Sequence, residues 1–160
     1  MSDSLLTVDV RAEQLIAQLA GSSAALMGDL KTAVDRLSIM VQGHVKDRKL
    51  SGQVLHVQTG TLRRSINRKV ILGDTSVLAQ VGTNVRYAAV HEYGFKGSVS
   101  VRSYTRSTAS GGATTVRGHS RRMDMPMRSF LRSTLADDAA EIRTTLRAAA
   151  VGSLQRAARG

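Results

Sequence analysis

The sequence contains no cysteine and no tryptophan, and its aromatic residues are two Phe and three Tyr. Without cysteine, it can form neither a disulfide framework nor a cysteine-based metal site. With so few aromatic residues, its core must be built from Leu, Val, Ile, Met and Ala. No stretch approaches the roughly 18 apolar residues that a membrane helix needs, and the N-terminus lacks the basic and apolar segments of a secretion signal. We therefore expect a protein that is made and used in the cytoplasm.

Acidic residues are scarce in the middle of the chain. Lys and Arg outnumber Asp and Glu by 23 to 12, a formal net charge of +11. No acid lies between Asp47 and Asp74, or between Glu92 and Asp124. Both gaps hold basic residues, namely Arg48, Lys49, Arg63, Arg64, Arg68 and Lys69 in the first, and Lys96, Arg102, Arg106, Arg117, Arg121 and Arg122 in the second. These blocks predict attraction to polyanions or to acidic protein surfaces.

The first long element is a helix. Apolar residues recur every three or four positions from Leu26 to Val45, which predicts about six helical turns. We interpret the apolar stripe as a packing face, with a dedicated partner-binding coil as the alternative. Before this helix, the alternation from Leu6 to Val10 predicts a short strand that leads into a short helix near residues 15–19.

A second long helix is predicted after Pro126, because the missing amide of a proline costs nothing in the first turn of a helix. Acids precede bases along it, in the order that the helix dipole favours: Asp137, Asp138, Glu141, Arg156 and Arg159. Its inner stripe is expected to be apolar: Leu131, Leu135, Ala139, Ile142, Leu146, Ala149 and Leu154.

The centre of the chain predicts a small antiparallel sheet. Ile66, Val70 and Leu72 fall on one face together with Arg68. After a Gly-Asp turn, residues 77–81 alternate again between apolar and other positions. This pattern with a period of two, interrupted by turn residues, is typical of a hairpin.

Two connecting segments flank the hairpin. Residues 50–58 are expected to form a polar linker. A short helix is expected from Tyr87 to Tyr93, ended by Gly94 in a left-handed cap. Tyr87 and Val90, with Tyr93 as a further candidate, would point inward.

Residues 95–123 predict an extended arm. Val99 and Val101 alternate with serines, a tip rich in Ser, Gly and Ala spans 107–113, and Val116 begins a return. Little of this segment is apolar enough to fold alone, so we expect either a long polar β-arm or a loop that becomes ordered on its partner.

The chain as a whole is predicted to be a single α+β domain over residues 1–160. A small antiparallel sheet packs against the long helix of the N-terminal half and against the C-terminal helix, and the arm leaves this body at about residues 95–123.

Candidate catalytic and metal-binding residues fail on their spacing. His91 and Glu92 resemble the start of a zinc-binding helix motif, but Phe95 stands where the second His would be. Glu92 has no second carboxylate or nucleophile at a recognisable spacing, so we expect it at the surface or in a subunit contact. Gly82 and Gly94 lack the pattern of a phosphate-binding loop. We expect no enzyme activity, no metal and no cofactor.

The basic arm leaves three alternatives open. Binders of single-stranded nucleic acid combine a basic groove with aromatic stacking platforms, and only Tyr104 accompanies the arm arginines. Acidic neighbouring subunits are the alternative that we favour, because guanidinium pairs with carboxylate as readily as with phosphate. A merely solvated loop is the third.

Three segments, in this order, resemble the neck, tail-completion and virion-morphogenesis proteins of tailed phages. They are residues 59–66 (TGTLRRSI), residues 81–84 with 87–94 (VGTN and YAAVHEYG), and residues 125–131 (MPMRSFL). The residues that carry the resemblance are Thr59, Gly60, Leu62, Gly82, Tyr87, Glu92, Gly94, Pro126, Phe130 and Leu131. The chain departs from the family pattern at Met127, where Ala is frequent, and in the length of its arm.

The resemblance implies a structural virion protein assembled in the host cytoplasm, without enzymatic activity. It would be a subunit of a ring at the head–tail interface, as a neck, tail-completion or tail-terminator protein that joins head to tail around the DNA channel. A hexamer is expected, with a dodecamer as the alternative. Its neighbours would be head-completion or connector proteins on one side and tail-tube or terminator proteins on the other. Non-specific contact with genomic DNA is left open, and no membrane is involved.

On this view, one set of residues lies in the subunit interface of the arm: Arg102, Tyr104, Arg106, Arg117, Arg121 and Arg122. A second set faces a neighbour or the lumen: Arg63, Arg64 and Arg68. The main alternative is a basic nucleic-acid-binding protein, whose affinity for DNA would fall steeply with salt. A small hydrolase is disfavoured because the sequence shows no arrangement of nucleophile and base.

Overall fold

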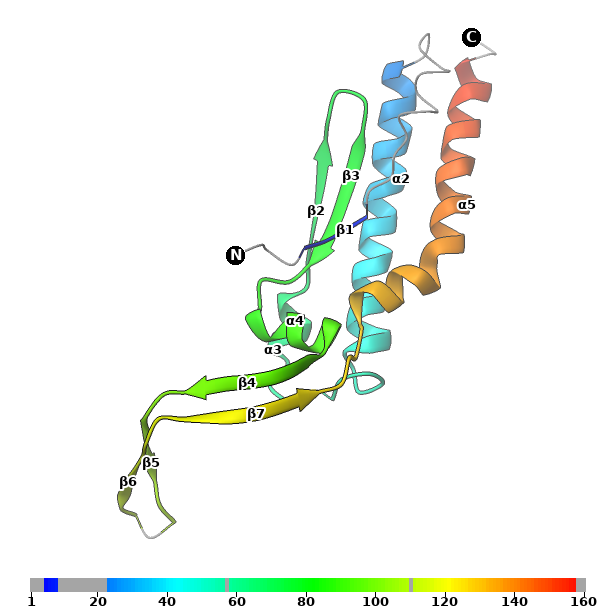
Figure 1. The fold of residues 1–160 in the computed structure, drawn as a ribbon. Helices are drawn as coiled ribbons and strands as arrows, with labels where there is room; N and C mark the ends of the chain where they lie inside the picture. Colours follow the sequence, from blue (N-terminus) through cyan, green and yellow to red (C-terminus); the bar gives the residue numbers. More distant parts are fainter. Residues whose placement is uncertain (1–4, 9–22, 57, 110, 158–160) are drawn as a thin grey trace.

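The computed structural model describes residues 5–8, 23–56, 58–109 and 111–157 (Figure 1). Its fold is α+β, as the sequence predicts. The elements of the body are β1 (Leu5–Val8), α2 (Ser23–His44), the π-helical turn η1 (Val45–Lys49), α3 (Thr61–Ser65), β2 (Asn67–Leu72), β3 (Val77–Gly82), α4 (Arg86–Tyr93) and α5 (Leu131–Ala157). The arm consists of β4 (Phe95–Val101), β5 (Tyr104–Ser107), β6 (Ala113–Val116) and β7 (His119–Met125).

The body has three layers, with α2 between the sheet and α5 (Figure 1). The predicted strand near the N-terminus is confirmed at Leu5–Val8; the short helix expected near residues 15–19 lies outside the described residues. Among the described helices, none is both long and apolar enough to cross a membrane.

The sheet is antiparallel, with strand order β1-β3-β2. Val77, Ala79 and Val81 of β3 are buried. Val81 is paired with Arg68, and Ala79 with Val70, so these residues share the face that packs on α2. The alternation seen in the sequence is therefore confirmed.

The apolar stripe of α2 forms the centre of the core. This helix is 22 residues long, as the periodicity predicts, and its buried apolar residues are Leu26, Leu30, Ala33, Val34, Leu37 and Val41. Gln42 extends from the same helix to the residue before β2, where its Nε2 donates a 2.7 Å hydrogen bond to the carbonyl of Ile66. The packing interpretation of the stripe is confirmed.

The linker at residues 50–58 is less polar in structure than predicted. Leu50 and Leu55 are 3% and 8% exposed and belong to the same core cluster as Val45. The backbone of Leu50 donates a 3.1 Å hydrogen bond to the carbonyl of Val45, so the chain leaves α2 through a wide turn and folds back under it. The prediction of a polar linker is wrong at these two leucines because the turn returns them to the core.

The inner face of α5 is more polar than its predicted stripe. Leu131 and Ile142 are buried as expected, but the same face also buries Thr134, Asp138 and Ser153. The side chain of Asp138 is 3% exposed, and its two carboxylate oxygens lie 2.8 and 2.9 Å from Nδ1 of His44 in α2. A buried carboxylate needs such a partner, so this contact fixes α5 against α2.

We predict that Asp138→Ala lowers the free energy of unfolding by roughly 2–4 kcal/mol, because it removes one partner of a buried pair. Asp137→Ala is the matched control. Asp137 pairs with Lys49 at 2.7 Å, but its side chain is 60% exposed, and exposed pairs contribute about 0.5 kcal/mol. Urea unfolding of both variants measures the difference, and equal losses would contradict the assignment.

Candidate functional site

The three segments that carry the family resemblance meet at one end of the body. Oγ of Ser65, in the first segment, lies 2.6 Å from Oγ1 of Thr83 in the second. Ile66, Val81 and Phe130, one from each segment, are buried in a single core cluster. The segments therefore form one structural unit at the base of the arm.

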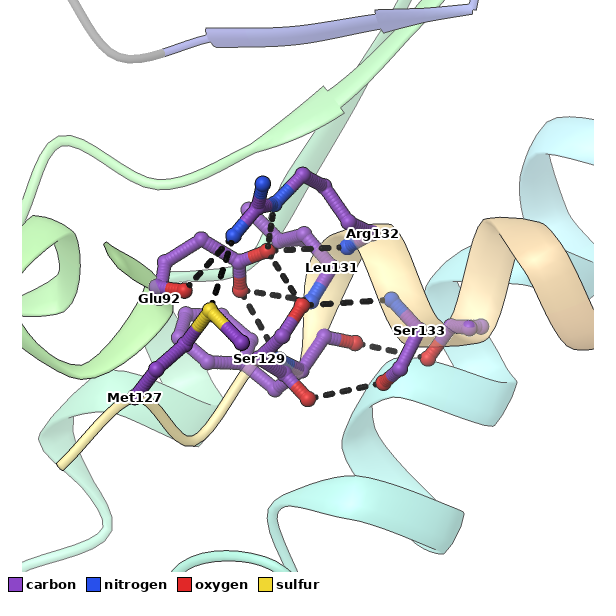
Figure 2. Close-up of polar contacts among 8 residues, drawn as sticks. Glu92, Met127, Ser129, Leu131, Arg132 and Ser133 are labelled. Carbon is purple, nitrogen blue, oxygen red and sulfur yellow. Dashed lines mark hydrogen bonds and ion pairs between the residues drawn. The ribbon is translucent and has the colours of Figure 1, made fainter. Parts of the chain in front are cut away.

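The centre of this unit is Glu92, which is 2% exposed and binds the start of α5 (Figure 2). Its Oε2 accepts hydrogen bonds from the backbone amides of Phe130, at 2.8 Å, and Leu131, at 2.9 Å. Its Oε1 accepts from the backbone amide of Arg132 at 3.0 Å, from Nε of Arg132 at 3.2 Å and from the hydroxyl of Ser129 at 2.7 Å.

These hydrogen bonds complete the N-terminus of α5. The first amides of a helix have no partner within the helix, and Glu92 accepts from three successive amides here. The next amide, of Ser133, donates to Oγ of Ser129 at 3.3 Å. A carboxylate at this position also interacts favourably with the positive end of the helix dipole.

The helix does not begin at Pro126, as the sequence suggested, but at Leu131. Residues 126–130 instead cross from the arm to the helix, and the backbone of Arg128 donates a 2.8 Å hydrogen bond to the carbonyl of His91. The start of α5 is thus set by α4, which lies far away in sequence, and not by the proline.

Glu92 is held in its ionised form. Burial raises the pKa of its carboxyl group, but hydrogen bonds from Leu131, Ser129, Arg132 and Phe130 outweigh burial and hold the pKa below its usual range. The expectation that Glu92 lies at the surface is wrong, because the atoms that it binds enclose it. The sequence held one indication of this burial. Glu92 follows Ala88 by four residues, so the two lie on the same face of α4, and Ala88 is buried too.

Arg132 covers the outer side of this contact. Its Nη2 donates to the carbonyl of Glu92 at 3.1 Å and contacts Sδ of Met127 at 3.3 Å, and its guanidinium lies 4.7 Å from the ring centroid of Tyr93. Tyr93 is 53% exposed and Tyr87 is 45% exposed. The prediction that these tyrosines point inward is wrong, since α4 turns Ala88 and Glu92 to the core.

Gly94 joins α4 to the arm. Its φ of 74° and ψ of 169° lie outside the left-handed helical region, so the predicted left-handed cap is wrong. A Cβ at this position would lie 3.0 Å from the backbone nitrogen of Met127 and 3.1 Å from the carbonyl oxygen of Met125. Glycine therefore allows the two strands of the arm to approach closely at their base.

The arm is a β-ribbon that leaves the body (Figure 1). β4 and β7 pair antiparallel from Phe95 opposite Met125 to Val101 opposite His119. β5 and β6 then continue the ribbon as a second antiparallel pair. Of the two predicted alternatives, the β-arm is the one that the structure contains.

One face of the β4–β7 ribbon carries most of its apolar side chains, with Arg121 and His119 towards the outer end. The pairing places Phe95 and Met125 on this face, with Gly97 opposite Met123 and Val99 opposite Arg121 further along. Its apolar side chains are partly exposed. Two-stranded ribbons are at best marginally stable alone in water, so this face is suited to packing against another molecule.

The arm also carries charge without matching acids. Asp124 forms a 3.5 Å pair with Lys96 at the base of the ribbon. Within the described part of the chain, no carboxylate pairs with the five arm arginines, all of which are exposed: Arg102, Arg106, Arg117, Arg121 and Arg122. Tyr104 is 48% exposed between them. These are the arm residues that we predict, from the sequence, to lie in a subunit interface.

The arginines expected at an interface or lumen have partners in their own chain. Arg63 pairs with Asp47 at 2.7 Å, and Nη2 of Arg64 donates to the carbonyl of Thr59 at 3.0 Å. Arg68 forms an ion pair with Asp35 of α2. Each is also exposed, so their role at an interface or lumen stays a prediction.

A groove of about 470 Å³ opens beside this unit. Residues 59–63 line one part of it, and Tyr87, His91 and Arg128 line another. All three resemblance segments border or support this hollow. Neither here nor elsewhere in the described residues could a cluster of three or more His, Asp or Glu side chains hold a metal ion.

We predict that E92Q lowers the free energy of unfolding at pH 7 by roughly 2–3 kcal/mol, because an amide cannot replace a carboxylate that accepts from several donors. A lowered folded pKa contributes stability above the usual pKa of glutamate, about 4.3, and this contribution is lost as the pH falls through the folded value. The difference between wild type and E92Q should therefore be full at neutral pH and shrink in acid.

The control for this prediction is E141Q, since Glu141 is exposed on α5 and has no ion-pair partner among the described residues. Thermal unfolding followed by circular dichroism between pH 3 and pH 7 measures both variants. A constant difference between wild type and E92Q across that range would contradict the role given to the charge of Glu92.

Comparison with known proteins places this unit in a family. No curated protein and no solved structure matches the chain. Residues 37–150 match the model of the phage virion morphogenesis family, a range that includes all three segments and the arm. The chain therefore belongs to the phage virion morphogenesis family.

Proposed function

We propose that this protein is a non-enzymatic ring subunit at the head–tail interface of a tailed phage, which joins head to tail around the DNA channel. Membership of the virion morphogenesis family supports a structural or assembly role in the virion. The observation that carries the finer proposal is the arm, a β-ribbon that leaves its own body with most apolar side chains on one face and with five arginines that no described carboxylate pairs with.

The arm has the properties of an element that binds neighbouring subunits. In a ring, each subunit presents one surface to the next, and the same contact repeats around the axis until the ring closes. A ribbon that extends beyond the body reaches a neighbour without requiring a large flat interface on the body itself. Its apolar face supplies buried area, and its arginines supply electrostatic register and specificity.

The arginines also indicate the chemistry of the neighbour. A guanidinium group on an exposed strand gains most from a planar carboxylate that it can bind through two parallel hydrogen bonds. The arm contains Asp124 as its one acid, and Lys96 already pairs with it, so the arm itself offers its arginines no further carboxylate. Acidic surfaces on adjoining virion proteins are the partners that fit.

We predict that replacing Arg102, Arg106 and Arg117 together by Glu blocks the joining of heads to tails. A phage whose own gene is disrupted would be complemented with plasmid-borne variants and scored by titre and electron microscopy. The triple variant should give filled heads and separate tails, with a titre near that of the disrupted gene. The matched control reverses Arg36, Arg143 and Arg147, three exposed arginines on α2 and α5.

Two results would contradict the proposal. One is a full titre with the arm variant, and the other is the absence of this chain from purified virions analysed by mass spectrometry. A third measurement addresses the nucleic-acid alternative. If the arm served DNA binding, the purified chain would bind duplex DNA with a logarithmic salt slope of about −0.9 per neutralised phosphate, and the arm variant would abolish that binding.

A further inference from the structure

The groove beside α4 is a second candidate binding surface, separate from the arm. It lies between the segment that follows α2 and the face of α4 that carries Tyr87 and His91, and Arg128 borders it from the segment after the arm. The arm does not line it. The residues of the groove itself therefore determine which partner fits it.

The groove is lined by basic residues and by no acid. The basic residues are two arginines and two histidines. Asp47 already neutralises Arg63 from outside the groove. The side chain of Arg128 is exposed and has no hydrogen-bond or ion-pair partner among the described residues, although its backbone is fixed to His91.

The charge of Arg128 affects His91, which lines the groove beside it. Burial, followed by the charge of the Arg128 guanidinium, lowers the pKa of His91, so the imidazole is largely neutral at pH 7. Its Nδ1 is buried and has no hydrogen-bond partner in the described structure. Of the two described arginines that line the groove, Arg128 is therefore the one without an acidic partner, and the hydrogen bond from its backbone to His91 fixes its main chain beside the groove.

The remainder of the groove is apolar enough to hold a side chain. The buried residues Leu50 and Leu55 and the partly buried Leu62 line it. Tyr87, 45% exposed, packs edge-on against His91 with ring centroids 6.0 Å apart. A ligand that fits this groove therefore combines a negative charge with an apolar side chain, which a DNA backbone does not offer.

Among its described residues, a second copy of this chain has few unpaired acids to contribute. Seven of its described carboxylates are already in ion pairs, those of Asp29, Asp35, Asp47, Glu92, Asp124, Asp137 and Asp138. Among the described residues, this leaves Asp74 and Glu141. The groove is therefore better matched to a different, acidic protein than to the described surface of a second copy.

We propose that this groove binds an extended acidic segment of another virion protein, with a carboxylate of the segment on the guanidinium of Arg128 and an apolar side chain against Leu50, Leu55 and Tyr87. An alternation of acidic and apolar residues suits an extended strand, whose successive side chains point in opposite directions. The inference adds a second contact to the proposed assembly role and rests on that role only for the partner being a virion protein.

The test uses the full-length chain and a fluorescein-labelled hexapeptide of alternating Glu and Leu, titrated by fluorescence anisotropy. We expect R128E to weaken binding about tenfold, which corresponds to about 1.4 kcal/mol. R86E is the matched control, because Arg86 is an exposed arginine at the start of α4 that does not line the groove. R86E should leave binding unchanged, and circular dichroism melting curves should show that both variants fold.

Three outcomes would overturn the inference. R86E could weaken binding as much as R128E, which would indicate an effect of net charge alone. A hexapeptide of alternating Gln and Leu could bind as tightly as the acidic one. The triple reversal of the arm arginines could abolish peptide binding while R128E does not, which would place the site on the arm. Peptide binding is measured without virions. The groove can therefore be shown to bind the acidic peptide even if the complementation experiment contradicts the proposed role in head–tail joining.

Discussion

The carboxylate of Glu92 is the contact on which the rest of this structure depends. It accepts hydrogen bonds from three successive amides at the start of α5 while it belongs to α4. α4 ends immediately before the first arm strand, and α5 begins shortly after the last one. One buried side chain therefore fixes both ends of the arm to the body, and the arm projects from a rigid base and not from a flexible loop.

The same contact positions the groove. His91 precedes Glu92 in α4, and Arg128 precedes Ser129, which donates its hydroxyl hydrogen bond to Glu92. The backbone bond between Arg128 and His91 joins these two sides of the groove. The arm and the groove, for which we propose different partners, are thus built around a single polar centre that fixes the position of one relative to the other.

Elements with strong local patterns could be predicted from the sequence. The stripe from Leu26 to Val45 and the alternation in residues 77–81 are periodic over several turns or residues, and both are confirmed. The polar β-arm could be predicted because a segment with few apolar residues and a glycine-rich tip has no core of its own. The resemblance of three short segments identified the family, since their order restricts the choice more than any one of them does.

The predictions that were wrong share a physical cause. Each concerns a residue whose position depends on contacts with residues distant in sequence. Glu92 looked like a surface acid, since nothing nearby shows that it meets the amides of residues 130–132. Asp138 looked like a helix-dipole charge and is instead buried against His44. Pro126 looked like a helix start, but the start of α5 is set by its capping partner. Polar residues with distant partners carry no periodicity, so pattern analysis assigns them to the surface.

The central claim is that the arm binds an adjoining molecule, and the absence of cysteine from the chain allows a direct measurement. A Tyr104→Cys variant, labelled at its thiol with a benzophenone photocrosslinker, would be incorporated into virions by complementation and irradiated. The account predicts covalent products between this chain and another protein molecule, identified by mass spectrometry. Crosslinks confined to the labelled chain itself would contradict it.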